Sequence, residues 1–187
     1  MRDADKETIR RCQEGDVSVL SQLLDVYGER IYAICRRMVG NDADAEDLMQ
    51  QVLLRVLDQA HTFDGRSRFW TWLSRVTANH ALNFLKAARR RRTEVLEDDA
   101  GAAPDPTRDP FEASARREDG AVLDRLLGRL AARHRAVLVL RELGELTYSE
   151  IAEALEIPVG TVMSRLARAR TRLRDLLESE NLVGPME

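Results

Sequence analysis

Residues 63–92 read FDGRSRFWTWLSRVTANHALNFLKAARRRR, and this stretch is the most informative part of the chain about its fold. A loop that contains Gly65 leads into a segment with apolar residues at helical spacing, which predicts one long helix. One stripe of that helix is largely apolar, and we predict that it faces the core. The stripe consists of Phe69, Leu73, Val76, Thr77, His80 and Phe84.

A second stripe of the same helix, about a quarter turn away, combines an aromatic ring with amides and cations. It consists of Trp72, Asn79, Asn83, Lys86 and Arg90. Bases stack on rings, base edges pair with amides and phosphates bind cations, so the pattern is typical of a surface for a nucleic-acid strand. The residues alone support a second interpretation equally well, in which Trp72 lies at the edge of the core and the arginines form a solvated helix end.

The composition favours an all-α fold. Of the 187 residues, 44% are hydrophobic but only 5% are aromatic, and Gly and Pro are few. No window reaches the run of about 18 apolar residues that a membrane-spanning helix needs, and the N-terminus is charged. We therefore expect a cytoplasmic chain without signal peptide or membrane insertion.

Charge is strongly segregated along the chain. The net charge of -3 looks unfavourable for a DNA-binding protein, but positive residues concentrate at 86–92 and 165–174 and acids at 42–47 and 94–109. Local patches rather than net charge govern contact with phosphates. Cys12 and Cys35 have neither CxxC nor zinc-site spacing, so buried or idle thiols are the default interpretation.

Helical periodicity and capping residues define three helices before the long one. They are predicted over residues 6–12, from Leu20 to Ile34, and through Leu48 to Val56 after a capping turn at 41–44. After the long helix, residues 93–110 read TEVLEDDAGAAPDPTRDP, with three prolines, many acids and no periodic apolar face.

We therefore predict two small helical domains, at residues 1–92 and 115–180, joined by a flexible acidic linker at 93–114. The second domain ends in a helix-turn-helix pattern. Thr147 and Glu150 have capping-box spacing, a short helix follows, and residues 156–160 form the turn.

The helix after this turn has small polar residues at its N-terminal end and arginines behind them. The residues that we predict to be exposed are Thr161, Ser164, Arg168 and Thr171, flanked by Arg165 and Arg172. This arrangement suits a recognition helix in a major groove, although an ordinary basic helical hairpin is an alternative.

Three motifs in this order resemble the extracytoplasmic-function (ECF) sigma factors of bacterial RNA polymerase. They are DAEDLMQQVLLRV at 44–56, FDGRSRFWTWLSRVTANHALNFL at 63–85, and LRELGELTYSEIAEALEIPVGTVMSRLARARTRLR at 140–174. The resemblance covers roughly Lys6 to Leu177. It implies a sigma region-two domain at 1–92 and a region-four domain at 115–180.

The resemblance implies that the first motif docks on core RNA polymerase, at the clamp helices of the largest subunit. The matching positions are Asp47, Leu48, Gln50 and Gln51. Gln51 departs from a common glutamate of the family and Leu53 from a common phenylalanine. Region four would contact the flap of the second subunit.

The second motif would recognise and melt the minus-ten promoter element. By resemblance, a flipped base of the non-template strand meets Phe63 in the loop and Asn79 on the helix, with Trp72 nearby. The single-stranded DNA surface as a whole would comprise Phe63, Trp72, Arg75, Asn79, Asn83, Lys86 and Arg90. An unstacked base recovers stacking on an aromatic ring and hydrogen bonds on an amide.

The third motif would bind the minus-thirty-five element as a duplex. Its implied reading residues are Thr161, Ser164, Arg165, Arg168 and Arg172. Met163 departs from an arginine that many relatives carry.

The predicted function is therefore that of an ECF sigma factor, with core RNA polymerase, promoter DNA and an anti-sigma factor as partners. No catalytic residue, cofactor or metal is expected, because the three histidines are far apart in sequence and no metal or phosphate-loop motif appears. An independent repressor would have no reason to carry the aromatic, amide and basic stripe. The remaining alternative is a sigma mimic that titrates an anti-sigma factor without binding promoters.

Overall fold

The computed structural model describes residues 4–98 and 115–180, with side chains at 4–90 and 120–180. The described residues form helices, turns and loops and contain no strand, which confirms the all-α prediction. Most of the predicted linker, residues 99–114, lies outside the described residues.

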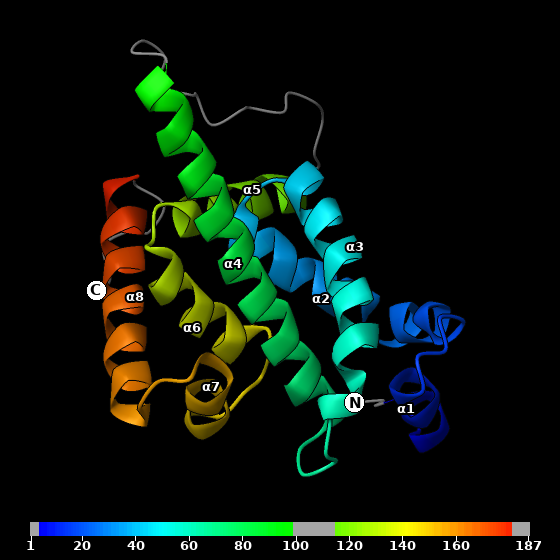
Figure 1. Ribbon diagram of the computed structural model, residues 1–187. Coiled ribbons are helices and arrows are strands. Elements are labelled where there is room, and N and C mark those ends of the chain that lie inside the picture. Colours follow the sequence, from blue (N-terminus) through cyan, green and yellow to red (C-terminus); the bar gives the residue numbers. More distant parts are fainter. Residues whose placement is uncertain (1–3, 99–114, 181–187) are drawn as a thin grey trace.

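The first unit contains α1 (Lys6–Gln13), α2 (Val19–Val39), α3 (Asp42–Gln59) and α4 (Phe69–Asp98), with a short 3-10 turn at Ala60–Thr62. Figure 1 shows α4 crossing the middle of the molecule, with α2 and α3 on one side. On the other side lie α6 (Ala132–Glu142), α7 (Tyr148–Leu155) and α8 (Val159–Ser179).

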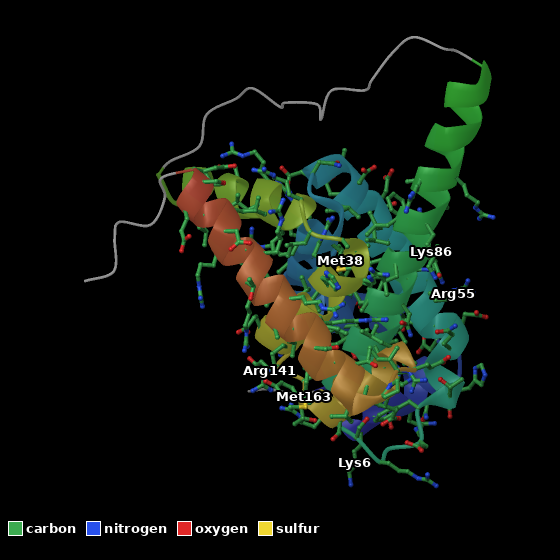
Figure 2. All side chains as sticks on the ribbon, turned by 90° about the vertical axis from the view of Figure 1, so that its left-hand side faces the viewer. Lys6, Met38, Arg55, Lys86, Arg141 and Met163 are labelled. Atoms are coloured by element: carbon green, nitrogen blue, oxygen red, sulfur yellow. The ribbon has the colours of Figure 1, made fainter. Side chains whose placement is uncertain are left out.

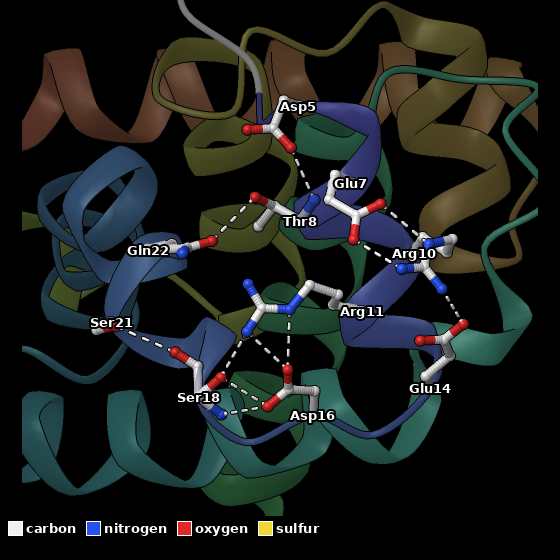
Figure 3. A network of polar contacts seen from close by, with 10 residues as sticks. All are labelled: Asp5, Glu7, Thr8, Arg10, Arg11, Glu14, Asp16, Ser18, Ser21 and Gln22. Atoms are coloured by element: carbon white, nitrogen blue, oxygen red, sulfur yellow. Dashed lines mark hydrogen bonds and ion pairs between the residues drawn. The ribbon is translucent and has the colours of Figure 1, made fainter.

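Polar contacts between α1 and α2 fix the turn that joins these helices (Figure 3). Asp16 accepts hydrogen bonds from the backbone and hydroxyl of Ser18 and forms an ion pair with Arg11 at 2.7 Å. Hydrogen bonds from Ser18 and Arg11 lower the pKa of Asp16 to about 2. Thr8 also donates to Gln22 at 3.0 Å, so the short α1 is held against α2 by side chains as well as by packing.

Stacked aromatic rings and aliphatic side chains form the core of the first unit. Tyr27 on α2 stacks on Trp70 of α4 with ring centroids 5.7 Å apart, and Trp70 is completely buried. Leu48, Val52 and other apolar residues of α3 pack against the same cluster. Asn41 caps α3 by accepting a hydrogen bond from the backbone of Asp44 at 2.8 Å, as its place in the predicted turn indicates.

The long helix differs from its prediction at both its C-terminal end and its buried surface. It continues to Asp98, so the first six residues of the predicted linker, 93–98, are helical. Only the segment after them contains prolines and glycine, the residues that stop a helix. Four residues of the predicted core stripe are buried, whereas His80 and Phe84 are half-buried.

The second unit contains α5 (Ala115–Gly128), α6 (Ala132–Glu142), α7 (Tyr148–Leu155) and α8 (Val159–Ser179). The capping box is present at the start of α7, because Thr147 accepts from the backbone of Glu150 while the Glu150 carboxylate accepts from the backbone of Thr147. Helices α7 and α8 pack on each other and on α6, which confirms the helix-turn-helix pattern.

The two units pack against each other, and no sequence pattern predicted this contact. Ala78 of α4 belongs to the core of the second unit, and Val139 of α6 packs into the core of the first. The Trp70 indole donates to the carbonyl of Gly144 at 2.7 Å. Glycine is needed there, since a Cβ at Gly144 would lie 2.5 Å from the carbonyl oxygen of Leu140.

Buried charges reinforce the contact between the units. Asp124 of α5 forms ion pairs with Arg36, at 2.9 Å, and with Arg37, both on α2. Burial raises the pKa of Asp124, although Arg37 and Arg36 act in the opposite direction. Arg135 of α6 reaches across to the carbonyl of Met38 at the end of α2, which lies in the interior of the molecule (Figure 2).

Candidate nucleic-acid interface

A pocket of about 440 Å³ lies beside α4, between this helix, the end of α3 and the following turn. It is lined by Arg55, Gln59, Thr62, Trp72, Arg75, Val76, Asn79, His80 and Asn83. Four of the residues predicted for single-stranded DNA are therefore brought together. Lys86 (Figure 2) and Arg90 lie further along α4, and both are exposed.

The aromatic wall of this pocket is more enclosed than expected. Trp72 is only 8% exposed, and its indole donates to the Thr62 hydroxyl at 3.2 Å. Its ring packs against Phe63 and Phe69, with centroids 5.9 Å and 5.3 Å away. Of the two interpretations of Trp72, the structure supports a ring at the edge of the core, because these three aromatic side chains close the end of the core together.

Helix α7 of the second unit occupies the polar groups along one edge of the pocket. The Asn79 amide donates to the carbonyl of Ala154 at 2.9 Å, and Arg75 lies 3.4 Å from the carboxylate of Glu153. One turn earlier on α4, the Thr71 hydroxyl donates to Glu150 at 3.0 Å. Three donors of α4 are thus matched by three acceptors of α7.

The acid at the start of α7 remains charged in this contact. Burial raises the pKa of Glu150, but hydrogen bonds from Thr147 and Thr71 outweigh that effect, so the pKa lies below its ordinary value. A phosphate group approaching Thr71 or Arg75 would consequently meet the like charges of Glu150 and Glu153.

His80 and Gln51 connect the pocket to the exposed side of α3. The Nε2 atom of His80 lies 3.1 Å from the side-chain oxygen of Gln51. Burial and, to a lesser extent, the positive charge of Arg55 lower the pKa of His80. The imidazole is therefore neutral at physiological pH and contributes a hydrogen bond rather than a charge.

The predicted polymerase-docking residues divide between the two sides of α3. Asp47, Gln50 and Gln51 are exposed, but Leu48 is completely buried in the core. The expectation that Leu48 is accessible was wrong, because it lies on the same helical face as the buried Val52. Leu54 is a large apolar residue of this helix that is 65% exposed. It lies seven residues after Asp47 and four after Gln50, which places it on the same side of the helix as both.

The predicted duplex-binding residues lie along the outer side of α8. Ser164, Arg168 and Arg172 are exposed, whereas Thr161 and Arg165 are half-buried. The opposite side of the helix is buried in the second core through Val162, Leu166, Ala169 and Leu176. The basic side chains therefore project away from the packed side of the helix-turn-helix.

Several residues of these surfaces had no functional interpretation from sequence. Arg55, Gln59 and Thr62 line the pocket but come from α3 and the turn after it, so the periodicity of α4 could not identify them. Glu150 and Glu153 contact α4 across more than 70 residues of sequence, and no local pattern indicates that contact.

The described part of the chain offers neither a membrane-spanning helix nor a metal site. No helix there is both long and apolar enough to cross a membrane. No group of three or more His, Cys, Asp or Glu side chains there is arranged to hold a metal ion.

Two family models match the chain in the order that the motifs indicated. The model for sigma-70 region 2 matches residues 23–91, and the model for sigma-70 region 4 matches residues 121–173. The chain is 32% identical over 180 residues to the ECF RNA polymerase sigma factor SigW of Bacillus subtilis (strain 168), covering 92% of this chain and 96% of that protein. It is 31% identical over 189 residues to the ECF RNA polymerase sigma-E factor of Escherichia coli (strain K12), covering 97% and 95%.

Solved structures agree with the fold. The sigma factor RpoE of Bartonella quintana, solved with the anti-sigma factor NepR, is 25% identical with a TM-score of 0.69, covering 87% of this chain and 98% of that chain. CnrH, solved with the cytosolic domain of CnrY, is 22% identical with a TM-score of 0.67, covering 95% and 99%, and supports the fold alone. The resemblance is confirmed, and the chain belongs to the ECF family of RNA polymerase sigma factors, which direct promoter-specific transcription initiation.

Proposed function

We propose that this sigma factor docks on core RNA polymerase through the exposed side of α3, reads the minus-ten element at the pocket beside α4, and reads the minus-thirty-five duplex with α8. The observation that carries the proposal is the pocket, which joins an aromatic ring, two asparagine amides and two guanidinium groups. Its volume of about 440 Å³ falls in the range of small-molecule sites and leaves room for one extruded base.

A flipped base in this pocket would find partners for each of its surfaces. Trp72 offers the aromatic wall, Asn79 and Asn83 offer amide groups to the base edge, and Arg55 and Arg75 attract the adjacent phosphates. The enclosed position of Trp72 favours edge or partial stacking over stacking on a free ring. Lys86 and Arg90 extend the basic surface along α4.

The packed arrangement of the two units opposes this use of the pocket. A base edge must compete with the Ala154 carbonyl for the Asn79 amide, and a phosphate must displace Glu153 from Arg75. We infer that minus-ten recognition requires α7 to leave α4, and that docking on the polymerase supports the separated arrangement.

The two DNA surfaces predict a division of labour between substitutions. Arg168→Ala should weaken binding of upstream duplex by about 1–3 kcal/mol if the arginine makes a bidentate base contact. Asn79→Ala should instead impair strand opening, and the defect should shrink on a pre-melted bubble. Filter binding and potassium permanganate footprinting with holoenzyme measure the two steps.

Arg133→Ala is the matched control, since Arg133 is an exposed arginine of the same unit outside α8. Equal loss of duplex binding in Arg168→Ala, Asn79→Ala and Arg133→Ala would contradict the assignment of separate surfaces.

Docking through α3 is tested at two exposed residues of that helix. Replacing Asp47 and Gln50 together by alanine should lower affinity for core polymerase by about 5- to 100-fold, since two polar interface contacts are lost, each worth about 0.5–1.5 kcal/mol. Fluorescence anisotropy of the labelled full chain against core enzyme measures this affinity. Circular dichroism should remain unchanged, because both side chains are exposed.

Asp58 and Gln13 provide the control, because both lie in the first unit outside the proposed docking residues. A double variant Asp58→Ala with Gln13→Ala should keep wild-type affinity. Unchanged affinity of the Asp47 and Gln50 variant would refute docking at this surface. Binding of core enzyme without a promoter-specific transcript would point to the sigma mimic instead.

We also propose that the chain works in the cytoplasm and is held by an anti-sigma factor. The support for this partner is the likeness to the Bartonella quintana sigma factor, which was solved with such an inhibitor. The cytoplasmic location is proposed because bacterial RNA polymerase and promoter DNA are in the cytoplasm.

A further inference from the structure

The N-terminal half of α8 carries exposed apolar side chains. Met163 is 54% exposed and Val159 is 41% exposed, and Ala167 is exposed one turn after Met163. A single exposed apolar residue needs no explanation. Here, however, the large apolar side chains lie at the N-terminal end of the helix that is proposed to enter the major groove, and Met163 projects there from α8 (Figure 2).

The position of Met163 on the helix places it beside the proposed reading residues. It precedes Ser164 in sequence, and Ala167 and Arg168 follow one turn later. The core side of α8 is occupied by Val162 and Leu166, both buried. Met163 therefore flanks the reading face and has no role in the core.

The chemistry of this side chain limits what it can recognise. A thioether has no hydrogen-bond donor, so Met163 cannot donate to guanine O6 and N7 as an arginine would. The C5-methyl group of thymine is the apolar group that base pairs present in the major groove, and apolar side chains contact it. Arg165, Arg168 and Arg172 of the same helix add positive charge that favours its approach to DNA.

We propose that Met163, supported by Ala167, is a specificity-determining residue that selects a thymine methyl group in the upstream promoter element. The inference rests on the proposed placement of α8 in the major groove. It specifies the chemical group that is read there: a methyl group on an A·T pair rather than the hydrogen-bonding edge of a G·C pair.

The test uses holoenzyme made with the full chain and upstream duplexes selected from a randomised library. Each selected thymine is then replaced by deoxyuridine, which removes only the methyl group. Wild-type holoenzyme should lose about fourfold in affinity at one or two adjacent positions, the effect of burying about one methyl group. Met163→Ala should bind the thymine and deoxyuridine duplexes equally at those positions.

Val17→Ala is the matched control, since Val17 is an apolar side chain 65% exposed on the first unit. It should keep the wild-type preference for thymine. Met163→Arg should shift the selected base toward guanine. Tight, sequence-specific binding by the wild type that is indifferent to every thymine-to-deoxyuridine change would overturn the inference while leaving the proposed function intact. Absence of any sequence-specific duplex binding by holoenzyme would instead overturn the proposed function.

Discussion

Replacing Arg135 with methionine is expected to lower the free energy of unfolding by about 2–4 kcal/mol. Arg135 is 7% exposed and donates to three backbone carbonyls, those of Met38, Gly128 and Leu130. Methionine retains much of the volume but no donor, so three backbone carbonyls lose a charge-assisted bond, two of them buried. Removal of a buried guanidinium, whose pKa is lowered by burial, offsets part of this loss.

Urea denaturation of the full chain measures this change. Arg133→Met is the matched control, because it makes the same substitution at an exposed position two residues earlier on α6. The control should stay within about 0.5 kcal/mol of wild type, as most surface substitutions do. Equal stability of the two variants would contradict the structural role of Arg135.

Local features of this fold could be predicted from sequence because their causes are local. The capping box at Thr147 and Glu150 requires only two side chains on adjacent helical positions and backbone N–H groups beside them. The same holds for Asn41 at the start of α3 and for the apolar spacing within each helix. The three motifs identified the family because each is a short run of residues that can be recognised without the tertiary structure.

The surroundings of α4 could not be predicted, because periodicity shows that a face is apolar but does not identify what covers it. Trp70, Thr71 and Ala78 lie outside the predicted core stripe, yet all are buried. Ala78 belongs to the core of the second unit, whereas Trp70 stacks on Tyr27 of the first. Trp70 and Thr71 also have hydrogen-bond partners in the second unit, 74 and 79 residues further along the chain.

The candidate site shows the same limit at the level of single residues. Asn79 was placed on a surface by its helical position, and the structure does bring it to the pocket. Its amide nevertheless bonds to Ala154 on α7, which only the tertiary structure reveals. Leu48 shows the opposite case. Its position in the docking motif suggested contact with a partner, but it shares a helical face with Val52 and both residues are buried in the core.

Cross-linking α4 to α7 should abolish promoter opening, and this is the largest functional effect that we expect. Arg75 and Glu153 lie 3.4 Å apart at their charged ends, so a cysteine at each position can be bridged by a short, reducible bis-maleimide. The native thiols do not interfere, because Cys12 and Cys35 are completely buried. Burial raises the pKa of Cys12 to about 11 and that of Cys35 to about 12, so neither forms the reactive thiolate at neutral pH.

The expected loss follows from the competition at the edge of the pocket. In the bridged chain, the Asn79 amide stays hydrogen-bonded to the Ala154 carbonyl. Helix α7 cannot move away to admit a base and its phosphates. The apparent affinity for the minus-ten strand falls with the fraction of molecules that reach the separated arrangement, and the bridge reduces that fraction toward zero. Open-complex formation by holoenzyme should therefore fall to the level of core polymerase alone, and reduction of the bridge should restore it.

Two controls separate closure from chemical damage. Each single-cysteine variant treated with the same reagent shows the effect of losing Arg75 or Glu153 and of carrying the adduct. A bridge between Glu142→Cys and Arg170→Cys, whose native side chains lie 3.0 Å apart, joins two elements of the second unit and leaves α4 free. That bridge should permit promoter opening. If the chain bridged between α4 and α7 opened promoters as well as its reduced form, α7 would not need to leave α4, and the pocket would be accessible in the packed arrangement.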